Sequence, residues 1–211
     1  MTLQININNQ YSFKDSIADV LDICYTNLKN GYTQETKQQC AIMINLCKNI
    51  LKTVPSNYND FIRNYTLVFG IMFRGIIDFC DICNITHKTK WNEDHKKIEK
   101  TWVLMCDCND RIALSIDYYE SSLLNWILCE MTTIKNEFNN AFGNSLYFSP
   151  EIINIKPKCN ICQLDCRACI HLAGNIYDGK LCRFIPEDVS VVSTSIVFEP
   201  CDPVVEFGHG I

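Results

Sequence analysis

The sequence has few of the residues, and none of the motifs, on which enzymes commonly depend. Among its 211 residues there are only eight glycines and four histidines. There is no glycine-rich phosphate loop, no G-x-S-x-G turn and no H-E-x-x-H zinc motif. A catalytic zinc ion usually has histidine or carboxylate ligands and an open coordination position. We therefore expect a protein that is not an enzyme.

Positive charge is also scarce. Lys and Arg number 19 against 24 Asp and Glu, which gives a net charge of −5. Such a surface does not attract a phosphate backbone. Only residues 88–102 (KTKWNEDHKKIEKTW) combine several lysines with aromatic residues, and Glu93, Asp94 and Glu99 largely cancel that charge. Nucleic-acid binding is disfavoured, and a zinc-ribbon transcription regulator that contacts nucleic acid is kept as an alternative.

The sequence shows neither a signal peptide nor a long hydrophobic run. Residues 1–16 lack the basic and apolar regions of a secretion signal. The most apolar run, Leu67–Phe79, is too short to span a bilayer and is interrupted by Arg74. We expect a protein that is neither secreted nor in a membrane. In a reducing compartment, clustered cysteines bind metals more often than they form disulfides.

Cysteine is abundant, with 14 residues, and some of these cysteines fall within predicted helices. Apolar residues recur at helical spacing over 12–31, 33–55, 59–79 and 121–138. The third segment is apolar around most of its circumference, which predicts the central helix of a small bundle. Four cysteines on these apolar faces are expected to be small buried hydrophobic residues: Cys24, Cys40, Cys47 and Cys129.

Short strands are predicted in the remaining segments. Residues 101–119 alternate between apolar and polar side chains and contain Asn109-Asp110, a hairpin signal, and residues 189–199 are rich in β-branched side chains. The expected fold class is α+β. A helical region at 1–79 is followed by a zinc-binding α+β region at 80–211 with β-hairpins and one further helix, and the two could form one compact domain.

Two cysteine clusters have the spacing of metal sites. In the first, Cys80-x2-Cys83 leaves a helix end and Cys106-x-Cys108 lies at the tip of the expected hairpin. A C-x2-C turn offers two thiolates from one tight loop, and alternate residues of a strand face the same side. We predict a zinc ribbon here, in which a histidine could replace one thiol: His87 or His95.

The second cluster, residues 158–182, holds five cysteines and His171. The preferred ligands are Cys159, Cys162, Cys182 and one of Cys166 or Cys169. A compact alternative is Cys159, Cys162, Cys166 and Cys169, and His171 is a further candidate. Two structural zinc ions are predicted, one for each cluster, and Cys201 with His209 could complete another site.

Other cysteine chemistry fits the spacing less well. The second cluster reads C-x2-C-x3-C-x2-C without a following proline, unlike the ferredoxin run C-x2-C-x2-C-x3-C-P. A thioredoxin-like motif needs a βαβ pattern, which is missing. A RING domain would need a later C-x2-C pair, which the sequence after Cys169 does not supply. An iron–sulfur or thiol redox protein is kept as a second alternative.

An acidic chain rich in Asn and Ile, in which a helical half precedes KCNICQLDCRAC (158–169), resembles the Cys-rich late-expression regulator family of alphabaculoviruses, which are large insect DNA viruses. The resemblance rests on length, composition and the cysteine-rich segment 159–182. It implies a viral regulatory protein of the host nucleus and cytoplasm. Such a protein acts through host or viral protein partners in late gene expression and in nuclear retention of the host actin-nucleating complex. Nuclear transport machinery is a further suspected partner, and a homodimer is compatible with the sequence.

Overall fold

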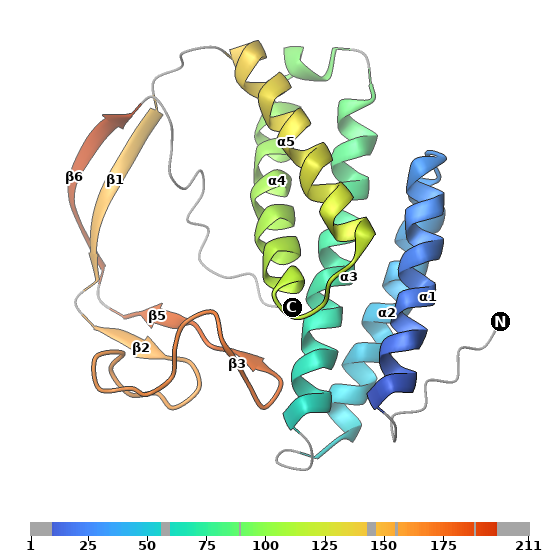
Figure 1. Cartoon of the computed structure of the whole chain (residues 1–211). Coiled ribbons are helices and arrows are strands. Elements are labelled where there is room, and N and C mark those ends of the chain that lie inside the picture. Colours follow the sequence, from blue (N-terminus) through green and yellow to red (C-terminus); the bar gives the residue numbers. More distant parts are fainter. Residues whose placement is uncertain are drawn as a thin grey trace.

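The computed structural model describes residues 10–55, 60–88, 90–142, 147–154, 156–187 and 189–197. In these residues, five α-helices precede a set of short antiparallel strands, which confirms the expected α+β class. The helices form one bundle, and the strands lie together along one flank of it (Figure 1).

The helical bundle is built from long helices with short connections. Its elements are α1 (Gln10–Lys29), α2 (Thr33–Thr53), α3 (Asp60–Thr86), the short 3₁₀ helix η1 (Trp91–Glu93), α4 (His95–Ile116) and α5 (Ser122–Phe142). The helices predicted over 12–31, 33–55, 59–79 and 121–138 are all present, and α3 continues past residue 79 to Thr86. Among the described helices, none combines the length and the apolar character needed to cross a membrane.

Helix α3 lies at the centre of the bundle, as its composition predicts, and packs against both α2 and α4 (Figure 1). Its aromatic side chains Phe69, Phe73 and Phe79 are fully buried. Burying an aromatic side chain of this size contributes roughly 1.5–3 kcal/mol. The bundle therefore has a core that requires no metal ion.

The hairpin predicted over residues 101–119 is wrong, because this segment forms most of α4. The Asp94 side chain caps the helix by accepting hydrogen bonds from the backbone N–H groups of Lys96 and Lys97. Steps of four and three residues, the helical period, separate the buried positions: Thr101, Met105, Cys108, Ile112 and Ser115. Two helices, α4 and α5, thus follow residue 80 where one was expected.

Most cysteines of the helices pack as apolar residues. Cys24, Cys40 and Cys47 are buried in the main core, as predicted. The prediction for Cys129 is wrong, because its side chain is exposed on α5. It follows Leu128 on the border between the buried and solvent-facing sides of that helix.

The strands form three separate antiparallel pairs. Strand β1 (Tyr147–Asn154) pairs with β6 (Val189–Val197), with an irregularity between Glu151 and Ile152. The chain between them holds β2 (Pro157–Cys159) paired with β5 (Phe184–Pro186), and β3 (Ile176–Tyr177) paired with β4 (Lys180–Leu181). We call residues 156–187, which contain the second cysteine cluster, the knuckle region.

The β3–β4 hairpin attaches the knuckle region to the bundle. Its two turn residues, Asp178 and Gly179, have φ of 46° and 69°, which matches the turn preferred in two-residue hairpins. Asn64 of α3 accepts a hydrogen bond of 2.7 Å from the Gly179 N–H. Ile176 is buried against Leu67, Val68 and Ile71 of α3.

Arg63 of α3 reinforces this attachment. Its Nε lies 2.6 Å from Asp178 Oδ1, and its Nη1 donates to the carbonyl oxygen of Leu51 at the end of α2. One buried guanidinium therefore ties the hairpin to two helices.

Candidate metal centre

Four side chains of the second cluster converge on one point. The sulfur atoms of Cys159, Cys162 and Cys169 and a ring nitrogen of His171 all lie within 4.8 Å of one another. Cys162 Sγ is 3.4 Å from Cys169 Sγ, and His171 Nδ1 is 3.3 Å from Cys169 Sγ. The distance from Cys159 Sγ to His171 Nδ1 is 3.8 Å. These residues could hold a metal ion.

Three of the six separations are close to the edges of a tetrahedron around one zinc ion. Zinc binds thiolate at about 2.3 Å and imidazole nitrogen at about 2.0–2.1 Å, which places two sulfurs about 3.8 Å apart and a sulfur and a nitrogen about 3.5 Å apart. The observed sulfur–sulfur and sulfur–nitrogen distances fall within about 0.4 Å of those edges. The space suits a single ion, because an iron–sulfur cluster with bridging sulfides holds its cysteines further apart.

Two tight loops present the ligands. The backbone N–H of Ile161 points at Cys159 Sγ at 3.4 Å, and that of His171 points at Cys169 Sγ at 3.1 Å. In the first loop Gln163 has φ of 62° and donates its N–H to the Cys159 carbonyl oxygen at 2.8 Å. Backbone N–H groups directed at sulfur favour the thiolate, which is the form that binds metal.

The electrostatics single out Cys159. Desolvation raises the pKa of its thiol, but the backbone N–H groups of Cys162 and Ile161 and the thiols of Cys169 and Cys182 outweigh it and lower the pKa to about 6. Desolvation raises the pKa of Cys169 and Cys182, each to about 11, and their proximity to Cys159 adds to the rise. An environment that favours the thiolate at Cys159 also favours a cation beside it.

Strand pairing and one asparagine hold the first loop in place. The Asn160 side chain accepts a hydrogen bond of 2.9 Å from the Arg183 N–H and donates one of 2.9 Å to the Leu181 carbonyl oxygen. An ion pair of 2.7 Å joins Lys158 to Glu187 across the ends of β2 and β5. The first cysteine loop is thus fixed to the strand that follows Cys182.

His171 is held in place by Tyr177. The two rings meet edge to face with centroids 4.7 Å apart, and the Tyr177 hydroxyl accepts a hydrogen bond of 3.0 Å from the Leu172 N–H. Contacts that orient a ligand ring are a common feature of metal sites. Tyr177 belongs to the hairpin that docks on α3, so the candidate metal centre is connected to the bundle.

The other two cysteines of the second cluster lie differently. Cys182 is fully buried, with its sulfur 3.8 Å from Cys159 Sγ, but it is not part of the group of four. Cys166 also lies outside that group, and its backbone N–H bonds to the Pro157 carbonyl oxygen. Three of the ligands preferred from the sequence, Cys159, Cys162 and Cys169, are thus in the group of four. His171 stands where Cys182 was expected.

The structure does not bring the first cluster together in the same way. In the described residues, the group of four is the one set of three or more candidate ligands that converges, and it includes none of Cys80, Cys83, Cys106 and Cys108. Residues two apart on a helix point in different directions, so Cys106 is half-buried while Cys108 is buried. The hairpin geometry on which the predicted zinc ribbon depends is absent here.

The thiols of the first cluster have the character of core residues. Desolvation raises the pKa of Cys83 to about 11 and that of Cys80 and Cys108 further. His87 is exposed after the end of α3. The side chain of His95, and both Cys201 and His209, lie outside what the structure describes.

Comparison of the chain with protein-family models, curated proteins and solved structures found no match.

Proposed function

We propose that this chain is a non-enzymatic, zinc-binding interaction protein whose zinc ion shapes a surface for a protein partner. Cys159, Cys162, Cys169 and His171 would hold the ion, and the observation that carries the proposal is that their four ligand atoms all lie within 4.8 Å of one another. Thiolate and imidazole ligands of this kind select zinc and form closed structural sites. Cys182 would then donate a hydrogen bond to the Cys159 thiolate.

The loop that carries two of these ligands also carries the most exposed apolar side chain of the knuckle region. Ile170, between Cys169 and His171, is 90% exposed, and Leu172 is 64% exposed. Single exposed apolar residues are ordinary, but these two flank a metal ligand, so a bound ion fixes their positions. Neighbouring exposed apolar residues mark binding surfaces in soluble proteins. We assign the partner-binding surface to Ile170 and Leu172.

The resemblance to the late-expression regulators suggests what the partner is. It would be a host or viral protein concerned with late gene expression or with retention of the actin-nucleating complex in the nucleus. Under this proposal the chain works in the nucleus and cytoplasm of an infected cell.

The metal part of the proposal is tested by elemental analysis of protein purified without added metal. One zinc per chain is expected. Replacement by Co²⁺ should give the visible absorption of a tetrahedral thiolate site. Iron with absorption bands of bridging sulfide would overturn the zinc assignment, and so would protein that contains no metal and does not take up Co²⁺.

The interface part is tested with the double variant Ile170→Asp/Leu172→Asp. Its matched control is Ile23→Asp/Ile42→Asp, because these two isoleucines are exposed on α1 and α2 of the bundle. Proteins retained on immobilised wild-type chain from infected insect cells are compared by mass spectrometry, after zinc content is shown to be equal. Selective loss with the Ile170/Leu172 variant is expected. An unchanged set of retained proteins would show that this surface is not the interface.

A further inference from the structure

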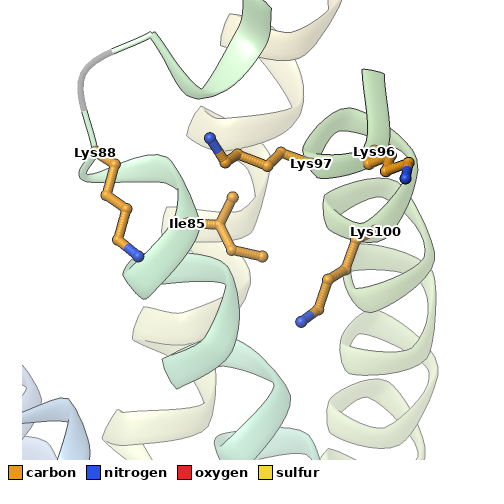
Figure 2. Close-up of a pocket in the computed structure, with 5 residues that line it drawn as sticks. All are labelled: Ile85, Lys88, Lys96, Lys97 and Lys100. Atoms are coloured by element: carbon orange, nitrogen blue, oxygen red, sulfur yellow. The ribbon is translucent and has the colours of Figure 1, made fainter. Parts of the chain in front are cut away.

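A cluster of lysines at one end of the bundle forms a second candidate site, far along the chain from the cysteines of the candidate metal centre. Lys88, Lys96, Lys97 and Lys100 line a hollow of about 270 Å³, together with Ile85. Lys88 follows the end of α3, and the other three lysines belong to the first turns of α4. Figure 2 shows Lys88, Lys97 and Lys100 from the two helices arranged around Ile85, whereas the Lys96 side chain points away from it.

Residues 88–102 hold five lysines against Glu93, Asp94 and Glu99, so the acidic residues leave two positive charges in excess. Glu93 pairs with Lys90 at 3.3 Å, and Asp94 pairs with Lys97 at 3.1 Å. Among the side chains that the structure describes, no acidic partner is found for Lys88, Lys96 or Lys100. The packing of α3 against α4 therefore concentrates positive charge in a protein whose net charge is −5.

The arrangement is unfavourable for the bundle alone. Lys96 and Lys100 are four residues apart on α4, and like charges at that spacing destabilise a helix by about 0.2–0.5 kcal/mol. An anion bound between the lysines would remove this repulsion. The lysine cluster thus does not stabilise α4, and a bound anion would account for it better.

We propose that this hollow, the lysine pocket, binds a compact anion that carries two or more phosphate groups. Ammonium groups stand on two walls of the hollow, so a ligand with charge at two positions can meet both walls while a single phosphate meets one. Ile85 gives the floor an apolar contact, which suits a short carbon framework between phosphates as well as an inorganic chain. Lysine is a common phosphate-binding residue and acts there as a point charge.

The test measures binding of inorganic tripolyphosphate to the zinc-loaded chain by calorimetry at low salt, with zinc content checked before and after. The test variant is Lys88→Gln/Lys100→Gln, which removes one charge from each wall. The control is Lys48→Gln/Lys52→Gln, which removes the same charge at exposed positions of α2. Each exposed ammonium is worth about threefold in affinity, so the test variant should bind about tenfold more weakly and the control about as well as the wild type.

Two further ligands sharpen the result. Orthophosphate should bind more weakly than tripolyphosphate, because it meets one wall, and affinity should fall as salt rises. If ATP binds at least as tightly as tripolyphosphate, the proposal is supported and the preferred ligand is an organic phosphate. If ATP binds clearly more weakly, the preferred ligand is an inorganic polyphosphate.

Three outcomes would overturn the assignment. They are the absence of tripolyphosphate binding, an equal loss of affinity in the two lysine variants, and binding of orthophosphate as tight as that of tripolyphosphate. None of these outcomes bears on the zinc centre, so the two proposals stand or fall separately.

Discussion

Replacing Gly179 by alanine should detach the knuckle region from the helical bundle while both keep their own structure. Gly179 has φ of +69° and sits directly against the bundle. A Cβ atom at this position would lie 3.0 Å from Leu51 Cδ2, 3.3 Å from Arg63 Cβ and 3.4 Å from the Arg63 carbonyl oxygen. The leucine end can move, but the Arg63 atoms belong to the backbone and stem of α3. The hairpin must therefore shift away.

The size of the effect follows from comparing the crowding in the docked form with the docking contacts. The positive φ costs an alanine about 1–2 kcal/mol whether or not the hairpin is docked, so only the crowding, which costs about 1–3 kcal/mol, favours undocking. Against this, the Asn64–Gly179 hydrogen bond contributes about 1 kcal/mol and the burial of Ile176 about 2 kcal/mol. The crowding is comparable with either of these two contacts, so an increase of roughly tenfold in the undocked population is expected.

Hydrogen exchange measures this directly, because the residue 179 N–H donates to the Asn64 side chain. In Gly179→Ala, amides of the β3–β4 hairpin should exchange faster, while the exchange of α3 core amides stays unchanged and the zinc-loaded protein keeps its metal. The control is Gly174→Ala, because Gly174 has φ of +87° but a Cβ atom added there would meet nothing within 4 Å. That variant carries the backbone strain without the collision. Equal exchange of the hairpin in Gly179→Ala and wild type, or equal acceleration in both variants, would refute the reasoning.

Three other predictions concern the metal, the thiols and a buried acid. Cys169→Ser or His171→Ala should weaken zinc binding at least tenfold in a competition with a chelator, whereas Cys166→Ser should leave the affinity unchanged. An equal loss of zinc affinity in all three variants would contradict the ligand set. In native protein, iodoacetamide should modify exposed Cys129 first and reach Cys47, whose pKa desolvation raises to about 12, only after unfolding; mass spectrometry of the digested chain gives the order. Desolvation raises the pKa of Asp78 to about 6 although Arg111 and Arg74 lower it, so the folded state favours its protonated form. Its contribution to the free energy of unfolding is then largest below about pH 4 and falls by roughly 3 kcal/mol as the pH rises through 6. In urea unfolding, Asp78→Asn should remove this part of the pH dependence. An unchanged dependence of the free energy of unfolding on pH would contradict the prediction.

The sequence identifies most of the fold because the apolar period of each long helix is local information. Ile17, Val20, Leu21 and Cys24 already mark the buried face of α1. The failure at α4 has a physical cause. The short window CDCN (106–109) alternates with a period of two residues, and only the longer series from Thr101 to Ser115 reveals the helical period.

The candidate metal centre is predictable in part. A C-x2-C spacing is enough to locate the loop at Cys159 and Cys162, since its geometry is nearly independent of the rest of the fold. The choice of His171 over Cys182 depends on the turn after Cys169 and on contact with Tyr177, which no spacing rule contains. The lysine pocket is harder still, because Lys88 and Lys100 become neighbours only when α3 and α4 pack.

The knuckle region has too small a core to fold unaided. Of its described residues, the buried apolar ones are Cys159, Ile176 and Cys182, and two of these are at or beside the candidate metal centre. Segments of this size usually need a metal ion or another external constraint. Here two constraints are available, the ion and the docking of the hairpin on α3, and Tyr177 contacts both His171 and the docked turn. Each constraint should therefore strengthen the other: chelation of zinc should accelerate hydrogen exchange in the hairpin, and Gly179→Ala should weaken zinc binding modestly. A partner that contacts Ile170 and Leu172 would then bind most tightly to the form in which zinc is bound and the hairpin is docked on α3. Only in that form are both side chains held in one position.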